Sequence, residues 1–284
     1  MVSRSLRKAI AKDTIEILEK GFYNNSDGEV ISIKDCLKYA KNNSIHYQPD
    51  ELEKLSTQVK EIIKNNSNSP IIEVTNETTL KAAYRVVVEE KTDNVVCLNF
   101  ASAKNPGGGF LNGSKAQEES LARSSGMFPC IFQMKLMYQT NKNFRSSIYT
   151  DNMIYSPQIP FFKDDEGNLL TNYYPLSIIT SPAVNRGAVE YNEPKKTHLI
   201  PEAMLSRIKK VLSVAIFHNH KTIILGAWGC GVFRNKASEM SQWFGEYLLE
   251  NKLFHNAFER IIFAVYDSSK DKNVFQSFKQ TFES

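Results

Sequence analysis

Cysteine is scarce in this chain. Its 284 residues contain four cysteines, Cys36, Cys97, Cys130 and Cys230, and no two of them form a C-x-x-C pair. A small protein held together by disulfides would carry a denser set of cysteines. The last three lie in or beside apolar runs, and free cysteine tends to be buried. We therefore expect free, buried thiols.

Long apolar runs are also missing. The sequence has no stretch of 18 uncharged apolar residues, and charged residues interrupt its first 23 positions every few residues. The first absence excludes a membrane-spanning helix of ordinary length. The second leaves no apolar core of a signal peptide in this segment. We expect a protein of the reducing cell interior, located in the cytoplasm and without a membrane partner.

The charges are nearly balanced. Lysine and arginine total 35 and aspartate and glutamate total 31, which gives a net charge of +4. So small an excess does not indicate a dedicated DNA-binding protein, although it would not repel an anionic ligand. Hydrophobic residues make up 42% of the chain, which argues against general disorder because disordered chains are poor in apolar residues.

The first 70 residues differ in pattern from the rest. Apolar residues recur there at helical spacing, polar turns are short, and little strand-like sequence occurs. We interpret residues 1–70 as an α-rich N-terminal extension packed on the core, and residues 71–284 as the main domain. The elements expected in the extension are a helix over 5–20 ended by Gly21, a strand pair around Gly28 and a helix over 51–64.

From residue 71 onward, strand-like runs alternate with helical patterns. Such alternation predicts an α/β fold whose sheet is covered by helices on both faces. Ligands bind such sheets at the carboxyl ends of the strands. The expected strands are 71–74, 94–100, 176–180, 222–225 and 260–266. The expected helices are 77–90, 203–217, 236–250 and 273–282.

Two of these strands run into glycine-rich loops. The first leads to Gly107, Gly108 and Gly109, and the second leads into residues 226–233. Consecutive glycines cost backbone entropy, but they let the main chain approach a ligand and offer N–H groups to phosphate oxygens. A plain tight turn would also explain either loop. Neither G-x-x-x-x-G-K-[ST] nor G-x-G-x-x-G occurs in these loops, which argues against a P-loop hydrolase and a dinucleotide-dependent dehydrogenase.

An acidic pair, Glu118 and Glu119, follows the first loop and Gln117. An acidic pair at a helix start usually serves the helix dipole. This pair lies just beyond a candidate phosphate loop, so it could also face a bound sugar phosphate.

The order Gly107-Gly108-Gly109, seven residues, then Gln117-Glu118-Glu119 resembles the G-G-G-x(6–8)-Q-E-E signature of poly(ADP-ribose) glycohydrolases. The segments 72–78, 99–101 and 229–233 are similar to the microbial branch of that family. The resemblance implies a three-layer α/β/α macrodomain with a mixed sheet, preceded by the α-rich extension. It also implies a glycoside hydrolase that releases ADP-ribose from the ends of poly(ADP-ribose).

The resemblance implies a role for each site residue. Glu119 would be the catalytic acid, Glu118 would hold the distal ribose hydroxyls, and Gln117 would support the loop. The glycines of the first loop would pack against diphosphate and ribose, and Phe233 would fix the terminal ribose. The implied substrate-binding residues are Asn105, Gly107, Gly108, Gly109, Gln117, Ala227, Gly229, Cys230, Gly231, Val232 and Phe233.

The chemistry suits these residue types. A bond between two riboses breaks through an oxocarbenium-like state, and the leaving hydroxyl needs a proton from a carboxylic acid. A carboxyl beside a diphosphate and a second carboxylate should have a raised pKa, so that Glu119 can donate a proton and later activate water. This scheme requires no metal and no cofactor. The expected partners are poly(ADP-ribose), ADP-ribose and ADP-ribosylated proteins, with the chain acting as a monomer.

Two other functions stay open. The chain could hydrolyse mono-ADP-ribose from a protein or a nucleic acid, or it could be a macrodomain that binds ADP-ribose without turnover. The acidic pair disfavours the second alternative, because a binding module needs no acid.

Three further features receive structural interpretations. His218 and His220 could suggest a metal pair, but further ligands are not evident nearby, and a bound metal needs a full set. The aromatic segment 149–162 could form a hairpin that serves the core rather than a wall for adenine. Lys195 and Lys196 form a basic pair that we expect to be exposed.

Overall fold

The computed structural model describes residues 2–64, 66, 68–250 and 252–283. Its centre is a seven-stranded sheet with the strand order β3-β6-β7-β5-β8-β9-β4. The pairs β3–β6 and β6–β7 are antiparallel, and the other neighbours are parallel. The strands of this sheet are β3 (Ile45–Tyr47), β4 (Ile71–Thr75), β5 (Val95–Phe100), β6 (Met153–Lys163), β7 (Leu169–Ser181), β8 (Thr222–Leu225) and β9 (Arg260–Ala264).

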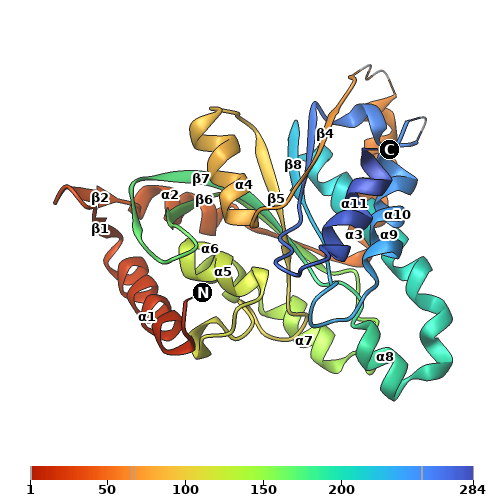
Figure 1. Ribbon diagram of the computed structural model, residues 1–284, viewed down its shortest axis with the longest axis horizontal. Coiled ribbons are helices and arrows are strands. Elements are labelled where there is room, and N and C mark those ends of the chain that lie inside the picture. The colour runs from red at the N-terminus through yellow and green to blue at the C-terminus, as the bar shows by residue number, and fades with distance from the viewer. Residues whose placement is uncertain (1, 65, 67, 251, 284) are drawn as a thin grey trace.

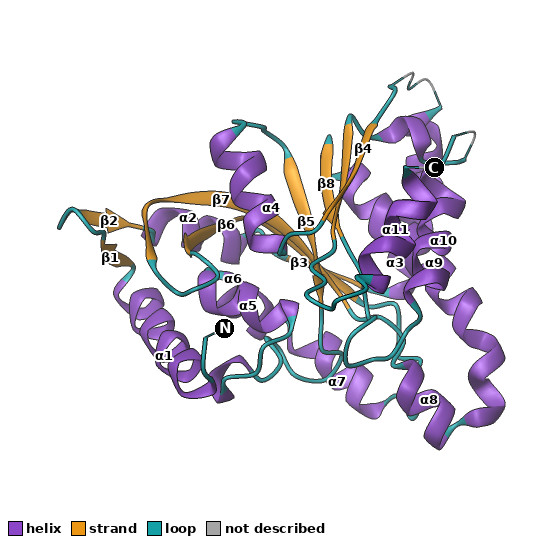
Figure 2. Ribbon diagram, in the orientation of Figure 1, coloured by secondary structure: helices purple, strands orange, loops and turns teal. Residues whose placement is uncertain are grey.

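Helices cover both faces of the sheet, as Figures 1 and 2 show. One core cluster joins the sheet to α3, α9, α10 and α11. The other joins it to α1, α2, α4, α5, α6 and α7. The predicted three-layer α/β/α architecture with a mixed sheet is therefore confirmed. The helices are α1 (Arg4–Lys20), α2 (Lys34–Asn42), α3 (Pro49–Ile63), α4 (Thr79–Tyr84), α5 (Gln117–Ser124), α6 (Met127–Phe132), α7 (Lys135–Asn143), α8 (Arg186–Asn192), α9 (Ile200–Phe217), α10 (Ala237–Leu248) and α11 (Asn273–Phe282).

The N-terminal segment shares its sheet and core with the rest of the chain. A small hairpin, β1 (Phe22–Asn24) with β2 (Val30–Ser32), surrounds Gly28 as predicted. The helix α1 ends at Gly21, whose φ of 79° is the left-handed conformation that glycine adopts at helix ends. Strand β3 pairs with β6, and α3 packs in the same core cluster as α9. The division of the chain at residue 70 stays a prediction.

The later elements follow the sequence pattern with local differences. Strand β5 is buried along almost its whole length, as its continuous apolar run predicts. The helix predicted over 77–90 is divided into α4 and a π-helical turn, Arg85–Glu89. The aromatic segment forms β6 of a long hairpin with β7, and Phe161 and Phe162 are fully buried in it. Its predicted role in the core is confirmed.

The thiols and histidines have local structural roles. All four cysteines are free. Cys97 and Cys130 are buried, whereas Cys36 and Cys230 are partly exposed, so the prediction of buried thiols is wrong for these two. His218 bonds the Tyr47 hydroxyl and His220 bonds the Tyr155 hydroxyl, each at 2.9 Å. These contacts agree with the structural interpretation of the histidines.

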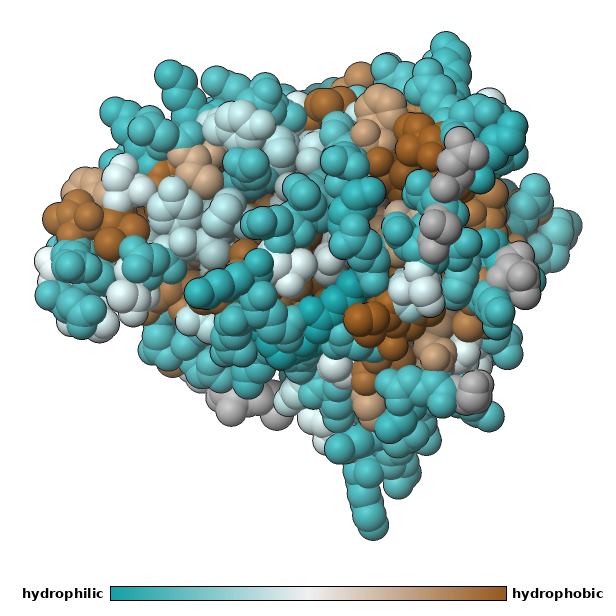
Figure 3. All heavy atoms as spheres, turned by 90° about the horizontal axis from the view of Figure 1, so that it is seen from above, coloured by the Kyte–Doolittle hydropathy of each residue, from teal (hydrophilic) through white to brown (hydrophobic). Residues whose placement is uncertain are grey.

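The surface is mixed. Figure 3, which views the molecule from above, shows hydrophilic residues over most of that face and small separate hydrophobic patches between them. Lys195 is exposed as predicted, while Lys196 bonds Glu193 at 2.8 Å. None of the helices in the described ranges is both long and apolar enough to cross a membrane.

Candidate active site

The two glycine loops start side by side at one edge of the sheet. Strands β5 and β8 are parallel neighbours, with Val95 opposite Thr222, so their carboxyl ends point to the same edge, the lower one in Figure 2. An ideal Cβ on Gly226 would lie 3.1 Å from the ring of Phe100, which ends β5. The predicted adjacency of these strands is confirmed.

The first loop brings the main chain close to both carboxylates. Gly108 has a φ of +56°, and a Cβ there would lie 2.4 Å from Glu119 Oε1 and 3.2 Å from Glu118 Oε2. Any other residue would therefore collide with the acidic pair and would also need a rare backbone conformation. The glycine allows the loop and the two carboxyl groups to meet.

Within the described residues, one carboxylate oxygen of Glu119 is hydrogen-bonded and the other is not. Its side chain is 9% exposed, and Oε1 accepts a hydrogen bond of 3.0 Å from the Gly109 N–H. Oε2 is buried and has no partner within the described part of the chain. Buried carboxylate oxygens are normally hydrogen-bonded, so this unpartnered oxygen is a candidate contact for a ligand.

Glu118 is buried more deeply. Oε2 accepts 2.7 Å from the Ser102 N–H, and Oε1 accepts 3.4 Å from Asn99 Nδ2. Burial, with a smaller contribution from the charge of Glu119, raises the pKa of Glu118 to about 8. The sequence suggested a raised pKa for Glu119, whereas the carboxyl whose pKa the structure raises is that of Glu118, because burial disfavours the charged form of a carboxyl group.

Gln117 fastens the start of α5 to the end of β5. Its Oε1 accepts from the Phe100 N–H at 2.9 Å, and its Nε2 donates to the Leu98 carbonyl at 2.8 Å. The amide thus bonds the main chain at both ends, an arrangement that supports the loop.

In the second loop, Gly229 packs against Asn235, whereas the residues directly after Cys230 are more exposed. Gly229 has a φ of +72°, and a Cβ there would lie 2.5 Å from Asn235 Nδ2. Asn235 Nδ2 donates to the Val184 carbonyl at 2.8 Å. Gly231 and Val232 are exposed, so their backbone groups are accessible to a ligand.

The remaining predicted site residues lie around these two loops. Asn105 is exposed at the start of the first loop, and its carbonyl accepts from the Gly108 N–H at 2.9 Å. Ala227 and Cys230 are partly buried against the core. The ring of Phe233 lies 6.1 Å from that of Tyr149, measured between centroids. The Phe233 carbonyl accepts from the Gly187 N–H at 3.1 Å, whereas both glutamates lie against Gly108 of the first loop.

Sequence reasoning missed the residues that orient this cluster. Asn99 is fully buried and donates to Glu118, and Ser102 donates its N–H to the same carboxyl. Asn99 is detectable in principle, since an amide inside an otherwise apolar strand needs a partner. Asn235 has no such signal, because its role depends on the folded path of the second loop.

Comparisons with known proteins identify the family of this chain. The family model for the microbial-type PARG catalytic domain matches residues 11–164, a little more than half of the chain. Comparison with curated proteins gives no match. The structure of a poly(ADP-ribose) glycohydrolase from Thermomonospora curvata is 39% identical, covers 97% of this chain and 99% of its own, and has a TM-score of 0.90.

Two liganded structures are also similar. The Thermomonospora curvata enzyme bound to the inhibitor ADP-HPD is 39% identical over 97% of this chain and 99% of its own, with a TM-score of 0.89. The Deinococcus radiodurans poly(ADP-ribose) glycohydrolase in complex with ADP-ribose is 40% identical over 87% of this chain and 97% of its own, with a TM-score of 0.82. This chain belongs to the microbial-type poly(ADP-ribose) glycohydrolase family.

Proposed function

We propose that this chain hydrolyses the ribose–ribose O-glycosidic bonds of poly(ADP-ribose) and releases ADP-ribose from the chain ends. The observation that supports this proposal best is the hydrogen bonding of the two Glu119 carboxylate oxygens. One oxygen is fixed by the Gly109 N–H, while the other is buried without a partner in the described residues. An unpartnered carboxyl oxygen of this kind has the chemistry that a proton donor to a bound sugar needs.

The reaction follows from the properties of this carboxyl group. Protonated Glu119 gives its proton to the leaving ribose oxygen while the glycosidic bond breaks and positive charge develops on the other ribose. The carboxylate then takes a proton from water, whose oxygen bonds the anomeric carbon. The proton returns to Glu119, so the enzyme ends as it began. The scheme assigns no step to a metal ion or a cofactor.

Glu118 has a different task. Both of its oxygens accept bonds from the protein, and burial keeps its pKa near 8. Near neutral pH the Glu118 carboxyl therefore retains its proton, and a bound diphosphate would favour this further. In this proposal Glu118 holds the ribose hydroxyls beside Glu119.

The glycine loops supply the remaining contacts. Backbone N–H groups of the exposed residues Gly231 and Val232 in the second loop bind the diphosphate oxygens, as such loops do in other phosphate sites. The first loop, residues 107–109, packs against the diphosphate and the ribose. Phe233 orients the terminal ribose. The complexes of the related proteins with ADP-ribose and ADP-HPD support a site for this class of ligand.

Several aspects of the cellular role are part of the same proposal. ADP-ribosylated proteins are the targets that carry the polymer, and the chain acts on them as a monomer in the cytoplasm. Sedimentation of the purified chain tests whether it is a monomer. A rise in its molecular mass with protein concentration would contradict this part of the proposal.

One assay separates the proposed activity from its alternatives. The chain is incubated with labelled poly(ADP-ribose), and the products are sized over time. Early release of ADP-ribose, with gradual shortening of the polymer, is the expected result. Removal of single units from mono-ADP-ribosylated protein with intact polymer would favour the mono-ADP-ribosyl hydrolase. Binding without any product would favour the non-catalytic macrodomain.

A further inference from the structure

The N-terminal helix α1 lies against the loop that leads from the glycines to α5 (Figure 1). Arg4 Nε donates to the Asn112 carbonyl at 3.1 Å, and Arg7 Nε donates to the Gly113 carbonyl at 2.7 Å. Gly113 has a φ of +76°, and a Cβ there would lie 2.5 Å from the Arg4 carbonyl oxygen. The two backbones therefore touch, and the arginines fix them at this point.

A second contact joins α1 to the far end of the same segment. Thr14 Oγ1 donates to the Arg123 carbonyl at 2.5 Å. The Arg123 guanidinium in turn donates to the Ser114 carbonyl at 2.5 Å. Ser114 packs on the glycine loop, since a Cβ on Gly109 would lie 2.5 Å from Ser114 Oγ. Helix α1 therefore contacts the segment 112–123, which contains Glu118 and Glu119, at both ends of that segment.

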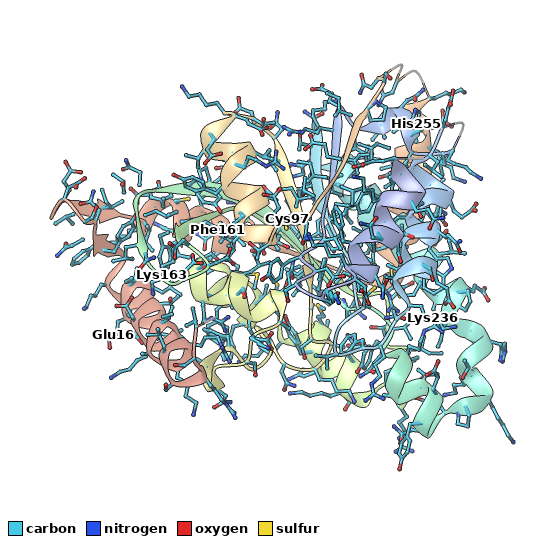
Figure 4. The ribbon with its side chains drawn as sticks, in the orientation of Figure 1. Glu16, Cys97, Phe161, Lys163, Lys236 and His255 are labelled. Atoms are coloured by element: carbon cyan, nitrogen blue, oxygen red, sulfur yellow. The ribbon has the colours of Figure 1, made fainter. Side chains whose placement is uncertain are left out.

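The helix is itself fixed to the sheet. Figure 4 shows Lys163, from the end of β6, beside α1, the helix that carries Glu16. The side chain of Lys163 is fully buried, and Nζ lies 2.6 Å from Asp13 Oδ2 and 2.7 Å from Thr14 Oγ1. A buried charge that loses its partner is strongly destabilising. The position of α1 relative to β6 is therefore well determined.

From these contacts we infer that Arg7 is a positioning residue for the reaction, with Arg4 in support. Arg7 holds the Gly113 carbonyl, and thereby the turn that places the Gly109 N–H against Glu119 Oε1. The family model matches residues from position 11 onward, so both arginines lie before the matched segment. The inference rests on the proposed role of Glu119.

The size of the effect follows from the geometry. Misplacing a catalytic group by about 1 Å can cost about 10² in rate. Loss of Arg7 alone leaves the contacts of Arg4 and Thr14 in place, so we expect a smaller loss of about 10-fold in kcat. Affinity for ADP-ribose should stay within about twofold, because the proposed diphosphate contacts come from the second glycine loop, which Arg7 does not touch.

The experiment compares Arg7→Ala and Arg7→Lys with a matched control on the same helix, Lys12→Ala. The Lys12 side chain is 82% exposed and reaches Glu16 at 3.9 Å. For each variant, kcat and KM on polymer, ADP-ribose affinity and the thermal midpoint are measured. We expect a lower kcat for Arg7→Ala at unchanged affinity, partial recovery in Arg7→Lys, and native behaviour of Lys12→Ala. If Arg7→Ala does not fold, Arg7→Met takes its place, since it keeps an unbranched aliphatic side chain but has no N–H donor.

A double variant tests whether Arg7 affects the rate by positioning Glu119. If Arg7 acts through Glu119, Arg7→Ala should cause no further loss in a Glu119→Gln background. An additive loss would overturn the inference, as would a kcat per folded molecule that is native in Arg7→Ala. Near-normal hydrolysis by Glu119→Gln alone would instead refute the proposed function, so the two failures are distinguishable.

Discussion

Gly108→Ala tests whether the close approach of the glycine loop to the carboxylates is required. The new Cβ would lie 2.4 Å from Glu119 Oε1, whereas ordinary contacts begin at 3.4 Å, so the carboxylate or the loop must move by 1.0 Å, the difference 3.4 − 2.4. A displacement of about 1 Å at a catalytic group can cost about 10² in rate. The left-handed φ of +56° adds a folding cost of about 1–2 kcal/mol.

The assay separates these two effects. Hydrolysis of labelled polymer gives kcat, and denaturant unfolding gives the change in stability. Gly28→Ala is the matched control, because Gly28 has a φ of +80° but nothing within 4 Å of its ideal Cβ. We expect both variants to lose similar stability and only Gly108→Ala to lose about 10² in kcat. A kcat for Gly108→Ala within about threefold of the native value would refute the reasoning.

Three further predictions concern the same site. Phe233→Ala should lower kcat more than it lowers ADP-ribose affinity, since its role is to orient the ribose; equal losses would make it a packing residue. The folded-state pKa of Glu118 is about 8 against an ordinary 4.5. Its contribution to stability is therefore complete below pH 4.5 and lost as the pH rises toward 8. The unfolding free energy of Glu118→Gln minus that of the native chain should therefore increase between about pH 5 and about pH 9 in denaturant titrations. A difference that does not change with pH would count against this prediction. ADP-ribose binding measured by calorimetry should survive a chelator, because the proposed donors are backbone N–H groups; loss of binding would contradict it.

The sequence predicts the sheet well where burial is strong. The runs that form β5 and β8 are almost wholly apolar. A strand that is buried on both faces requires apolar residues at nearly every position, so such runs predict these strands. The short helices α2, α6, α7 and α8 were not predicted. Helices of such length are marginal alone and form because tertiary contacts hold them.

The candidate site is only partly predictable for a related reason. Glycines next to an acidic pair are visible in the sequence, and so is their place after a buried strand. The partners that orient the pair are not, since Asn99 and Ser102 reach Glu118 only when β5 and α5 have packed. The same holds for Arg7, which lies 106 residues from the carbonyl it binds.

The most direct test of the account compares hydrolysis and binding in Glu119→Gln. Glutamine keeps the size and hydrogen-bonding capacity of the side chain but has no proton of suitable acidity to donate. The rate of polymer hydrolysis should fall by about 10²–10⁴ or more, the usual effect of losing a general acid, while ADP-ribose affinity stays near native. Near-normal hydrolysis by Glu119→Gln would contradict the assignment of the acid and the mechanism built on it.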